Sequence, residues 1–565
     1  MAESLRQSLA RYYREIRSSQ ARSIMVVLIL IVILALAVLG VQFLVRERGS
    51  LALLNWLNLL LIPLLLVTAA VWLAGTWKRT QLEIARLRDE RALVDSYYDR
   101  LTELLLGRNL RGAAADDEVA RAARAHTLMT LRQLNSEGRG HIVRFLYESS
   151  LLSAEQPAVD LQRADLSGSD LSGVAMAGIS LRNVDLHEAR LVETALPASD
   201  LRGADLDRAN LTRADLSESY LRGATLREAV LAGAQLRGAI MTKALLTDAD
   251  LRDADLSEAN LAGADLTRAN LAGANLKGAR LNGANLTDAT LDGANLSLAN
   301  LNKATLSGVQ ATAADFSGSN LAGATLVHAR LNGTMFGGAI LSEADLTDAE
   351  LRDSNLNLAN LRGAVMNQAI VTNANLRDAI MGRVSLSGSD LTGSDLSRAN
   401  LSIANLNRAI LNRTNLEEAG LSGADLRAAQ LKGAMLRGAI LRGAILGDAD
   451  LSRADLSKAN LRWANLSNAN LTGADLTEVD LTDAEVAPQI LAKARAVTKV
   501  ERSDSGQRYD VVPTATAVRE GPLPSTQVPT YQRPGAAPAA PDAGTSGTTA
   551  APRQPDKSGP LPGQN

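Results

Sequence analysis

Residues 254–266 read ADLSEANLAGADL, and this stretch decides the fold. A small residue, an Asp or Asn, and a leucine recur in that order every five residues. From Leu161 through Val486 there are 66 such central positions at strict multiples of five, and 57 of them are leucine. Neither insertion nor deletion interrupts the register, so the period of five is the dominant feature of the sequence.

A period of five is incompatible with an ordinary helix or a flat strand. On an α-helix, leucines five apart would spread over every side, because five residues advance about 500°. On a flat strand an odd period would place them alternately on opposite sides. A coil that bends at each repeat avoids both problems, because it keeps leucine and the small residue inside and turns the other three residues outward. Four such sides close one square turn, and stacked turns lie about 4.8 Å apart.

The A-[DN]-L-x-x text resembles that of the pentapeptide-repeat family over residues 161–485. The resemblance implies an all-β solenoid, a right-handed quadrilateral β-helix. With 65 quintets and four per coil, we expect about 16 coils and a length of roughly 75–80 Å. The resemblance does not imply a single activity, because function is carried by sites rather than by folds.

The front of the chain differs sharply in composition. Residues 1–23 are rich in arginine, and two apolar runs follow at 24–45 and 51–75. Each run is long enough to cross a bilayer as a helix, so 24–75 is predicted to be a transmembrane hairpin. A cleaved signal peptide is the alternative, which the continuation of the first run to Val45 disfavours. Residues 76–115 are predicted to be a helical stalk, either membrane-proximal or self-associating.

Basic residues flank the two apolar runs unequally. Five arginines precede the first run and five Lys or Arg follow the second, whereas the hinge between them carries two. The positive-inside rule therefore predicts that both termini are cytoplasmic, with the protein in a plasma or inner membrane.

Two capping segments are predicted at the ends of the repeats, because an open solenoid end exposes its core. Residues 116–158 form the expected amino-terminal cap, with a helix over 119–134, a turn over 136–140 and a short helix over 141–152. Residues 486–500 form the expected carboxyl-terminal cap, with helical spacing over 488–497. Residues 501–565 are rich in Pro, Gly and Ala, and this composition predicts a disordered tail.

Charge within the repeats is mixed. Residues 161–485 carry 30 Lys and Arg against 39 Asp and Glu. Because the signs alternate along the sequence, we expect no basic stripe along which a phosphate backbone could run, and nucleic acid is not favoured as a partner.

Large apolar residues at outward positions suggest a docking stripe. Residues twenty apart should stack, which places five of them on one face: Ile340, Ile380, Ile403, Ile440 and Trp463. Exposed apolar patches often mark interfaces. The alternative is that β-branched residues merely suit a strand-like surface.

The sequence lacks the marks of catalysis and of cofactor or metal binding. It has no cysteine, four scattered histidines and no phosphate-binding glycine motif. We therefore predict a non-enzymatic, membrane-tethered scaffold or adaptor, with unidentified protein partners, no small-molecule substrate, the bilayer as a partner of 24–75, and self-association through the stalk or hairpin. The family resemblance offers an alternative, since some soluble members mimic duplex DNA and protect DNA gyrase.

Overall fold

The computed structural model describes residues 51–113, 117–153 and 157–498. The chain divides into two compact units, Met1–Pro513 and Thr514–Asn565, and every described residue belongs to the first. The predictions for residues 1–23, the first span at 24–45 and the tail at 501–565 lie outside the described residues.

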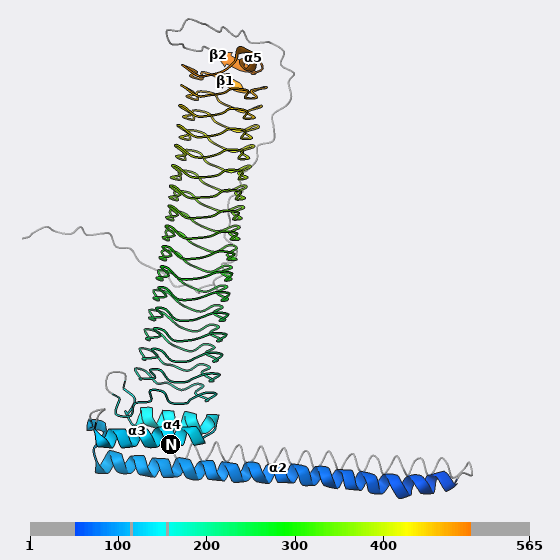
Figure 1. The fold of residues 1–565 in the computed structure, drawn as a ribbon, viewed down its shortest axis with the longest axis vertical. Helices are drawn as coiled ribbons and strands as arrows, with labels where there is room; N and C mark the ends of the chain where they lie inside the picture. The colour runs from blue at the N-terminus through cyan, green and yellow to red at the C-terminus, as the bar shows by residue number, and fades with distance from the viewer. Residues whose placement is uncertain (1–50, 114–116, 154–156, 499–565) are drawn as a thin grey trace, which may run out of the picture. The chain divides into compact units, whose positions relative to one another are not determined.

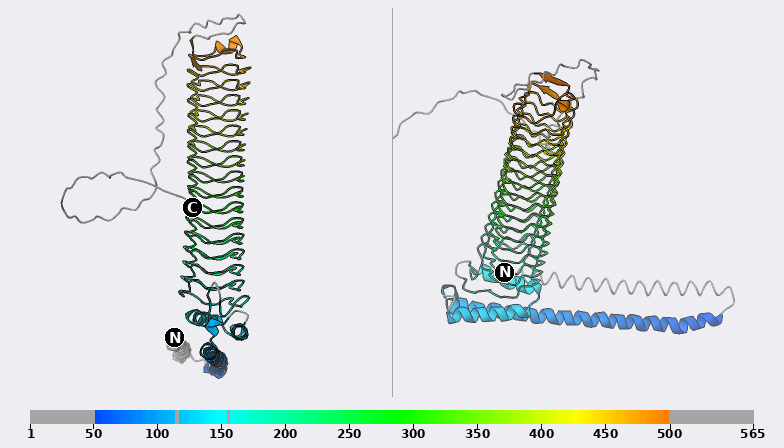
Figure 2. Two further views of the ribbon diagram at one scale, coloured as in Figure 1. Left: turned by 90° about the vertical axis from the view of Figure 1, so that its left-hand side faces the viewer. Right: turned by 45° about the horizontal axis from the view of Figure 1, so that its top comes forward.

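Parallel bridges twenty residues apart build the repeat region. Asp185 pairs with Asp205, which pairs with Thr225, and equivalent bridges continue from Asp165 to Glu485. Each coil therefore consumes four quintets, as the sequence predicts. The coils form a straight stack in which one turn lies directly on the next (Figures 1 and 2).

Most backbone N–H groups of each quintet donate to backbone carbonyl oxygens, chiefly in the neighbouring coils. In quintet 256–260, the N–H groups of Leu256 and Glu258 donate to carbonyl oxygens of the following coil, at 2.7 and 2.9 Å. The Asn260 N–H donates to the preceding coil at 2.9 Å, and the Ala259 N–H donates to the carbonyl of Leu256 at 3.1 Å. Four of five backbone donors are thus satisfied without any side chain, which accounts for the tolerance of varied outward residues.

The fifth donor explains the Asp or Asn before each leucine. The Ser257 N–H has no backbone acceptor, and it donates to the Asp255 carboxylate at 3.0 Å. The same contact, from the residue after the leucine to the one before it, recurs through the stack, for example at Asn320 and Asp345. Asp and Asn are suited to this local turn because their short side chains reach an N–H two residues further on.

The second residue after each leucine adopts a left-handed conformation. Glu258 has φ +60° and Gly263 has φ +64°, and the pattern continues along the coils. Gly tolerates this region best, so its abundance at this position follows from the turn.

The core consists of the inward leucines and the small residues between them. These side chains are almost completely buried along the whole stack. Phe316 and Phe336 replace leucine in adjacent coils, and their rings stack at 5.0 Å between centroids. The packing is therefore the continuous interior that the period of five predicts.

In the described part of the chain, four helical segments precede the coils: α2 (Leu51–Gly107), η1 (Leu110–Gly112), α3 (Glu118–Gln133) and α4 (Ser136–Glu148). The predicted span 51–75 and the stalk up to residue 106 are one uninterrupted helix. Within the described ranges, no helix combines the length and apolar character needed to cross a membrane.

The prediction of a turn over 136–140 is wrong, because these residues form the first turns of α4. Asn135 caps this helix by accepting a hydrogen bond from the Gly138 N–H at 2.8 Å. The two glycines of the segment suggested a loop, but Gly140 is required by packing. A Cβ on Gly140 would lie 2.2 Å from the carbonyl oxygen of Asp170 in the first coils.

The amino-terminal helices pack together and onto the first coils. The Tyr97 hydroxyl of α2 lies 2.9 Å from that of Thr127 in α3. Arg139 of α4 donates to the carbonyl of Ser167 at 2.6 Å and pairs with Asp165 at 3.1 Å. Their buried apolar side chains are continuous with the interior of the coils.

At the other end, up to residue 498, three short elements belong to or follow the last coils: β1 (Asp475–Thr477), α5 (Pro488–Leu491) and β2 (Ala496–Thr498). β2 pairs in parallel with β1 and extends the ladder by one strand. The helical spacing predicted over 488–497 is therefore correct only for the first four residues. Val497 lies in a strand, because the last ladder still offers backbone groups to pair with.

Candidate interaction surface

The coil stack presents four faces, each defined by the leucine positions that share it. Face 1 has centres at 161, 181 and every twentieth residue up to 481. Faces 2, 3 and 4 begin at 166, 171 and 176 in the same way. Each quintet contributes three outward residues: the one before the centre and the two after it.

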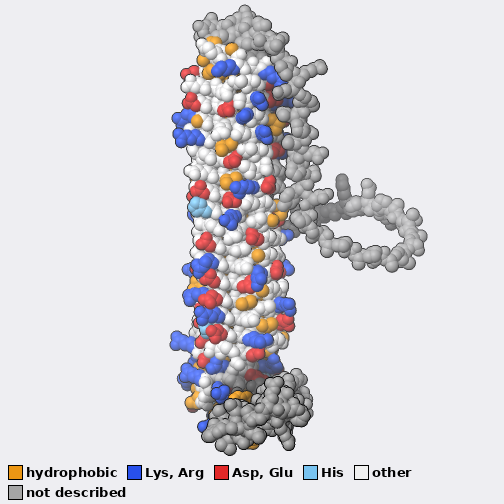
Figure 3. All heavy atoms as spheres, turned by 90° about the vertical axis from the view of Figure 1, so that its right-hand side faces the viewer, with side chains coloured by type: hydrophobic (Ala, Val, Ile, Leu, Met, Phe, Trp, Pro, Cys, Tyr) orange, Lys and Arg blue, Asp and Glu red, His pale blue; other side chains and the backbone are white. Residues whose placement is uncertain are grey.

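The charges of residues 161–485 are sorted by face. Face 1 carries eleven Lys and Arg against four Asp and Glu, whereas face 2 carries five against fourteen. Faces 3 and 4 carry eight against nine and six against twelve. The prediction that no basic stripe exists is therefore wrong for face 1. The signal was present in the sequence, but it emerges only when charges are grouped at intervals of twenty. Figure 3 shows one side of the stack, on which both signs appear together.

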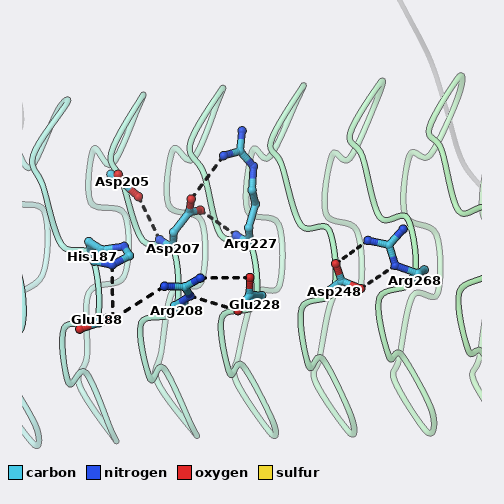
Figure 4. A network of polar contacts seen from close by, with 9 residues as sticks. All are labelled: His187, Glu188, Asp205, Asp207, Arg208, Arg227, Glu228, Asp248 and Arg268. Atoms are coloured by element: carbon cyan, nitrogen blue, oxygen red, sulfur yellow. Dashed lines mark hydrogen bonds and ion pairs between the residues drawn. The ribbon is translucent and has the colours of Figure 1, made fainter.

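Face 2 neutralises its own charges between adjacent coils (Figure 4). Arg208 lies 3.1 Å from Glu228, and Arg268 lies 2.6 Å from Asp248. The hydrogen bonds from Arg268 hold the pKa of Asp248 below its ordinary value. Much of the charge of face 2 is thus already paired within the molecule.

Face 1 leaves most of its cations unpaired. Eight exposed side chains on this face make no ion pair with any described residue: Arg163, Arg222, Lys243, Arg280, Lys303, Arg362, Arg383 and Arg442. Between residues 202 and 463 this face has a single acidic residue, Glu343. Its charge is therefore available to a partner.

Asp200 is the buried acid of face 1. Its side chain accepts two hydrogen bonds from the Arg202 guanidinium, at 2.8 and 2.6 Å, and lies 3.6 Å from Arg182. Burial raises the pKa of this carboxyl, but the bonds from Arg202 outweigh it, and the pKa is lowered overall.

The five residues of the predicted stripe lie together on face 1. Ile340, Ile380 and Ile440 belong to one ladder, and Ile403 and Trp463 occupy the left-handed position. Their exposed fractions run from 41% for Ile340 to 60% for Ile403. Exposed apolar residues also occur elsewhere, as at Leu298 and Leu358 on face 4. That the stripe binds a partner remains a prediction.

Two features indicate that these apolar residues are locally unfavourable for the stability of the coils. Where Ile380 replaces Asp or Asn, the Gly382 N–H has no acceptor among the described residues. Ile403 has φ +59°, a region that β-branched residues rarely adopt. Local cost of this kind is typical of residues retained for another purpose.

Trp463 is held in a defined position. Its indole N–H donates to Asp483 at 3.1 Å, and the Arg442 guanidinium lies 4.0 Å from the ring centroid. Arg462 approaches the same ring at 5.3 Å. Cation and aromatic ring therefore form one composite surface near the end of the stack.

No group of three or more His, Asp or Glu side chains gathers into a metal site among the described residues. The described histidines are scattered: His126, His141, His187 and His328.

A family model for pentapeptide repeats matches the chain in overlapping segments that together cover residues 160–242 and 244–483. The chain belongs to the pentapeptide-repeat family. The coils described above are accordingly the right-handed quadrilateral β-helix of pentapeptide-repeat proteins.

Solved pentapeptide-repeat structures are similar over parts of the chain. QnrB1, a plasmid-mediated fluoroquinolone resistance protein, is 20% identical; the match covers 38% of this chain and 92% of that one, with a TM-score of 0.23. A thylakoid-lumen protein from Arabidopsis thaliana is 33% identical over 20% and 79% of the two chains, with a TM-score of 0.17. HetL from the cyanobacterium Nostoc, involved in heterocyst differentiation regulation, is 26% identical over 56% and 91%, with a TM-score of 0.10. No curated protein matches the chain significantly.

Proposed function

We propose that this pentapeptide-repeat protein is a non-enzymatic, membrane-tethered scaffold that presents a rigid β-helix to protein partners. The proposal rests on the separate roles that the five residues of each quintet have in the structure. Two residues fill the core and one commonly caps the backbone, so function is left to the outward side chains. On face 1 these combine unpaired cations with exposed isoleucines and Trp463.

The tether in this proposal is the hairpin at 24–45 and 51–75, with both termini in the cytoplasm. The apolar runs and the basic flanks of the sequence support it. The exposed surface of α2 around Trp77 and Leu82 offers a route to self-association.

Topology tests the tether directly. Because the chain has no cysteine, Ser50→Cys and Ser525→Cys can be probed on intact cells with a membrane-impermeant thiol reagent. Labelling at 50 but not at 525 supports a cytoplasmic scaffold. Labelling at 525 would refute the proposed orientation.

Site-specific photo-cross-linking in cells tests the scaffold role. A photoreactive residue is placed at Ile380 or Ile440 on face 1, with Ile370 and Ile410, which hold the same residue type at the same position on face 3, as matched controls. The proposal expects a shared protein adduct from both face 1 positions and none from face 3. Equal adducts from both faces, or none from either, would refute it.

A gyrase-interacting DNA mimic is the second candidate. The acidic excess of faces 2 and 4 favours it, because a duplex mimic presents negative charge. The positive charge of face 1 disfavours this function, and so does a membrane tether. Supercoiling by gyrase with and without the purified protein separates the candidates: the absence of protection at stoichiometric excess removes this one.

A further inference from the structure

We propose that face 1 is the docking surface for an acidic protein segment that also carries apolar side chains. The inference rests on the proposed scaffold function and specifies the chemistry of the partner. It is carried by three observations: the charge of face 1, the acidic faces that border it, and the apolar residues along its carboxyl-terminal half.

The first observation is that the positive charge is uncompensated. Face 1 has seven more cations than anions, and the eight unpaired side chains extend from Arg163 to Arg442. Face 2 shows that the same backbone readily brings opposite charges together between coils, as at Arg268 and Asp248. The fold therefore does not force these cations to remain unpaired. The acidic groups of a partner could pair with them.

The second observation is that face 1 is narrow and bordered by acid. It is one quintet wide, and faces 2 and 4 on either side carry nine and six more anions than cations. A nucleic acid duplex is broader than a row of quintets, and its phosphates would meet these acidic borders. A single polypeptide segment avoids them, because it can follow the face lengthwise.

The third observation is that negative charge on a partner would not by itself satisfy the whole of face 1, because this face also exposes isoleucines and backbone N–H groups. Ile340, Ile380 and Ile440 are 41–47% exposed between the cations. The backbone N–H groups of Ser342, Gly382 and Arg442, two residues after each, have no acceptor among the described residues. Carboxylates and peptide carbonyls accept from such donors, and apolar side chains cover the isoleucines.

Binding of defined peptides to the purified full-length protein in a non-ionic detergent tests the proposal. The probes are fluorescent twenty-residue peptides that alternate Glu with Leu, Glu with Ser, or Lys with Leu. We expect the Glu–Leu peptide to bind at least tenfold more tightly than the other two. Its affinity should fall as salt rises, because exposed charges are screened. Equal binding of the Glu–Ser peptide would overturn the apolar part of the proposal.

Matched variants identify the face. The face 1 variant carries Arg280→Gln, Lys303→Gln, Arg362→Gln and Arg383→Gln. The face 3 control carries Arg330→Gln, Arg413→Gln, Lys432→Gln and Arg453→Gln, which also removes three Arg and one Lys that are exposed and make no ion pair. We expect at least a tenfold loss for the face 1 variant and less than twofold for the control. Equal losses would overturn the assignment.

A second variant excludes the possibility that a loss of binding results from unfolding. Ile380→Asn with Ile440→Asn removes the apolar groups and supplies the missing acceptors, so the coils should be at least as stable. This variant should lose most of the preference for Glu–Leu over Glu–Ser, and an unchanged preference would contradict the proposal.

Competitors separate other classes of partner. Displacement of the peptide by mixed micelles of the detergent with phosphatidylglycerol, but not by mixed micelles with phosphatidylcholine, would mark face 1 as a lipid-binding surface and overturn the proposal. Displacement by duplex DNA would overturn it in the same way. All of these tests use purified components, so their failure is distinct from an absence of cross-linked partners in cells, which would count against the scaffold function.

Discussion

Faces 1 and 2 of the coil stack share one backbone and one core, yet arginines are paired with carboxylates on face 2 and are mostly unpaired on face 1. On face 2, Arg208 and Arg268 each find a carboxylate in the neighbouring coil. On face 1, Arg222 and Arg280 find none among the described residues. Because the fold permits both arrangements, the difference reflects the outward residues themselves, and it identifies the face that is free to bind.

The largest expected effect tests whether the two faces really share one interior. Phe316→Ala should lower the free energy of unfolding by about 3–5 kcal/mol, since it leaves a cavity beside Phe336. Hydrogen exchange of the flanking coils should rise on all four faces alike. Phe336→Leu restores the repeat consensus and should cost less than about 1.5 kcal/mol. Exchange confined to a single face would show that the faces are not coupled through the core.

The next effect concerns the buried acid of face 1. Asp200→Asn should lower the free energy of unfolding at pH 7 by about 1–3 kcal/mol, because it replaces a carboxylate bonded to Arg202. The folded pKa of Asp200 is lowered, so its contribution is present above the unfolded pKa and is lost as pH falls through the folded pKa. Melting curves of wild type and variant should therefore converge toward acidic pH. A constant difference at all pH values would contradict this account.

The architecture of the repeats was predictable because a period of five admits few physical solutions. Leu256 must face inward in every coil, and Asp255 has a local partner in the Ser257 N–H, so short-range chemistry specifies the coil. Gly140 was misread, because the reason for it lies thirty residues away, at the carbonyl of Asp170. Val497 was misread for a similar reason, since its strand depends on the free edge of β1.

The candidate surface was predictable only in part. The apolar residues on face 1 were found by their spacing of twenty, whereas the cations were not, because opposite charges alternate along the sequence. Arg362 and Glu343 are nineteen residues apart and lie on one face, while sequence neighbours such as Asp353 lie on another. The stacking register, rather than proximity in sequence, determines which charges a partner meets.

A smaller effect compares the backbone caps of the two faces. Asp345 on face 2 accepts from the Thr347 N–H at 3.0 Å, and Asp345→Ala should cost about 0.5–1.5 kcal/mol. On face 1, Ile380→Asn supplies an acceptor to the Gly382 N–H and should stabilise by a similar amount. Thermal melts of the two variants should therefore shift in opposite directions. A downward shift for Ile380→Asn would show that this isoleucine contributes to the fold rather than to the surface alone.

The smallest effect bears most directly on the contrast between the faces. A double-mutant cycle with Arg268→Gln and Asp248→Asn should give only a small favourable coupling, as exposed ion pairs do. This coupling should vanish in 1 M salt, where the Debye length is about 3 Å. On face 1, Arg280→Gln should leave the melting temperature unchanged at both salt concentrations, because Arg280 has no carboxylate partner among the described residues. A measurable, salt-sensitive loss at Arg280 would mean that face 1 is neutralised within the molecule after all, and its charge would then not be free for a partner.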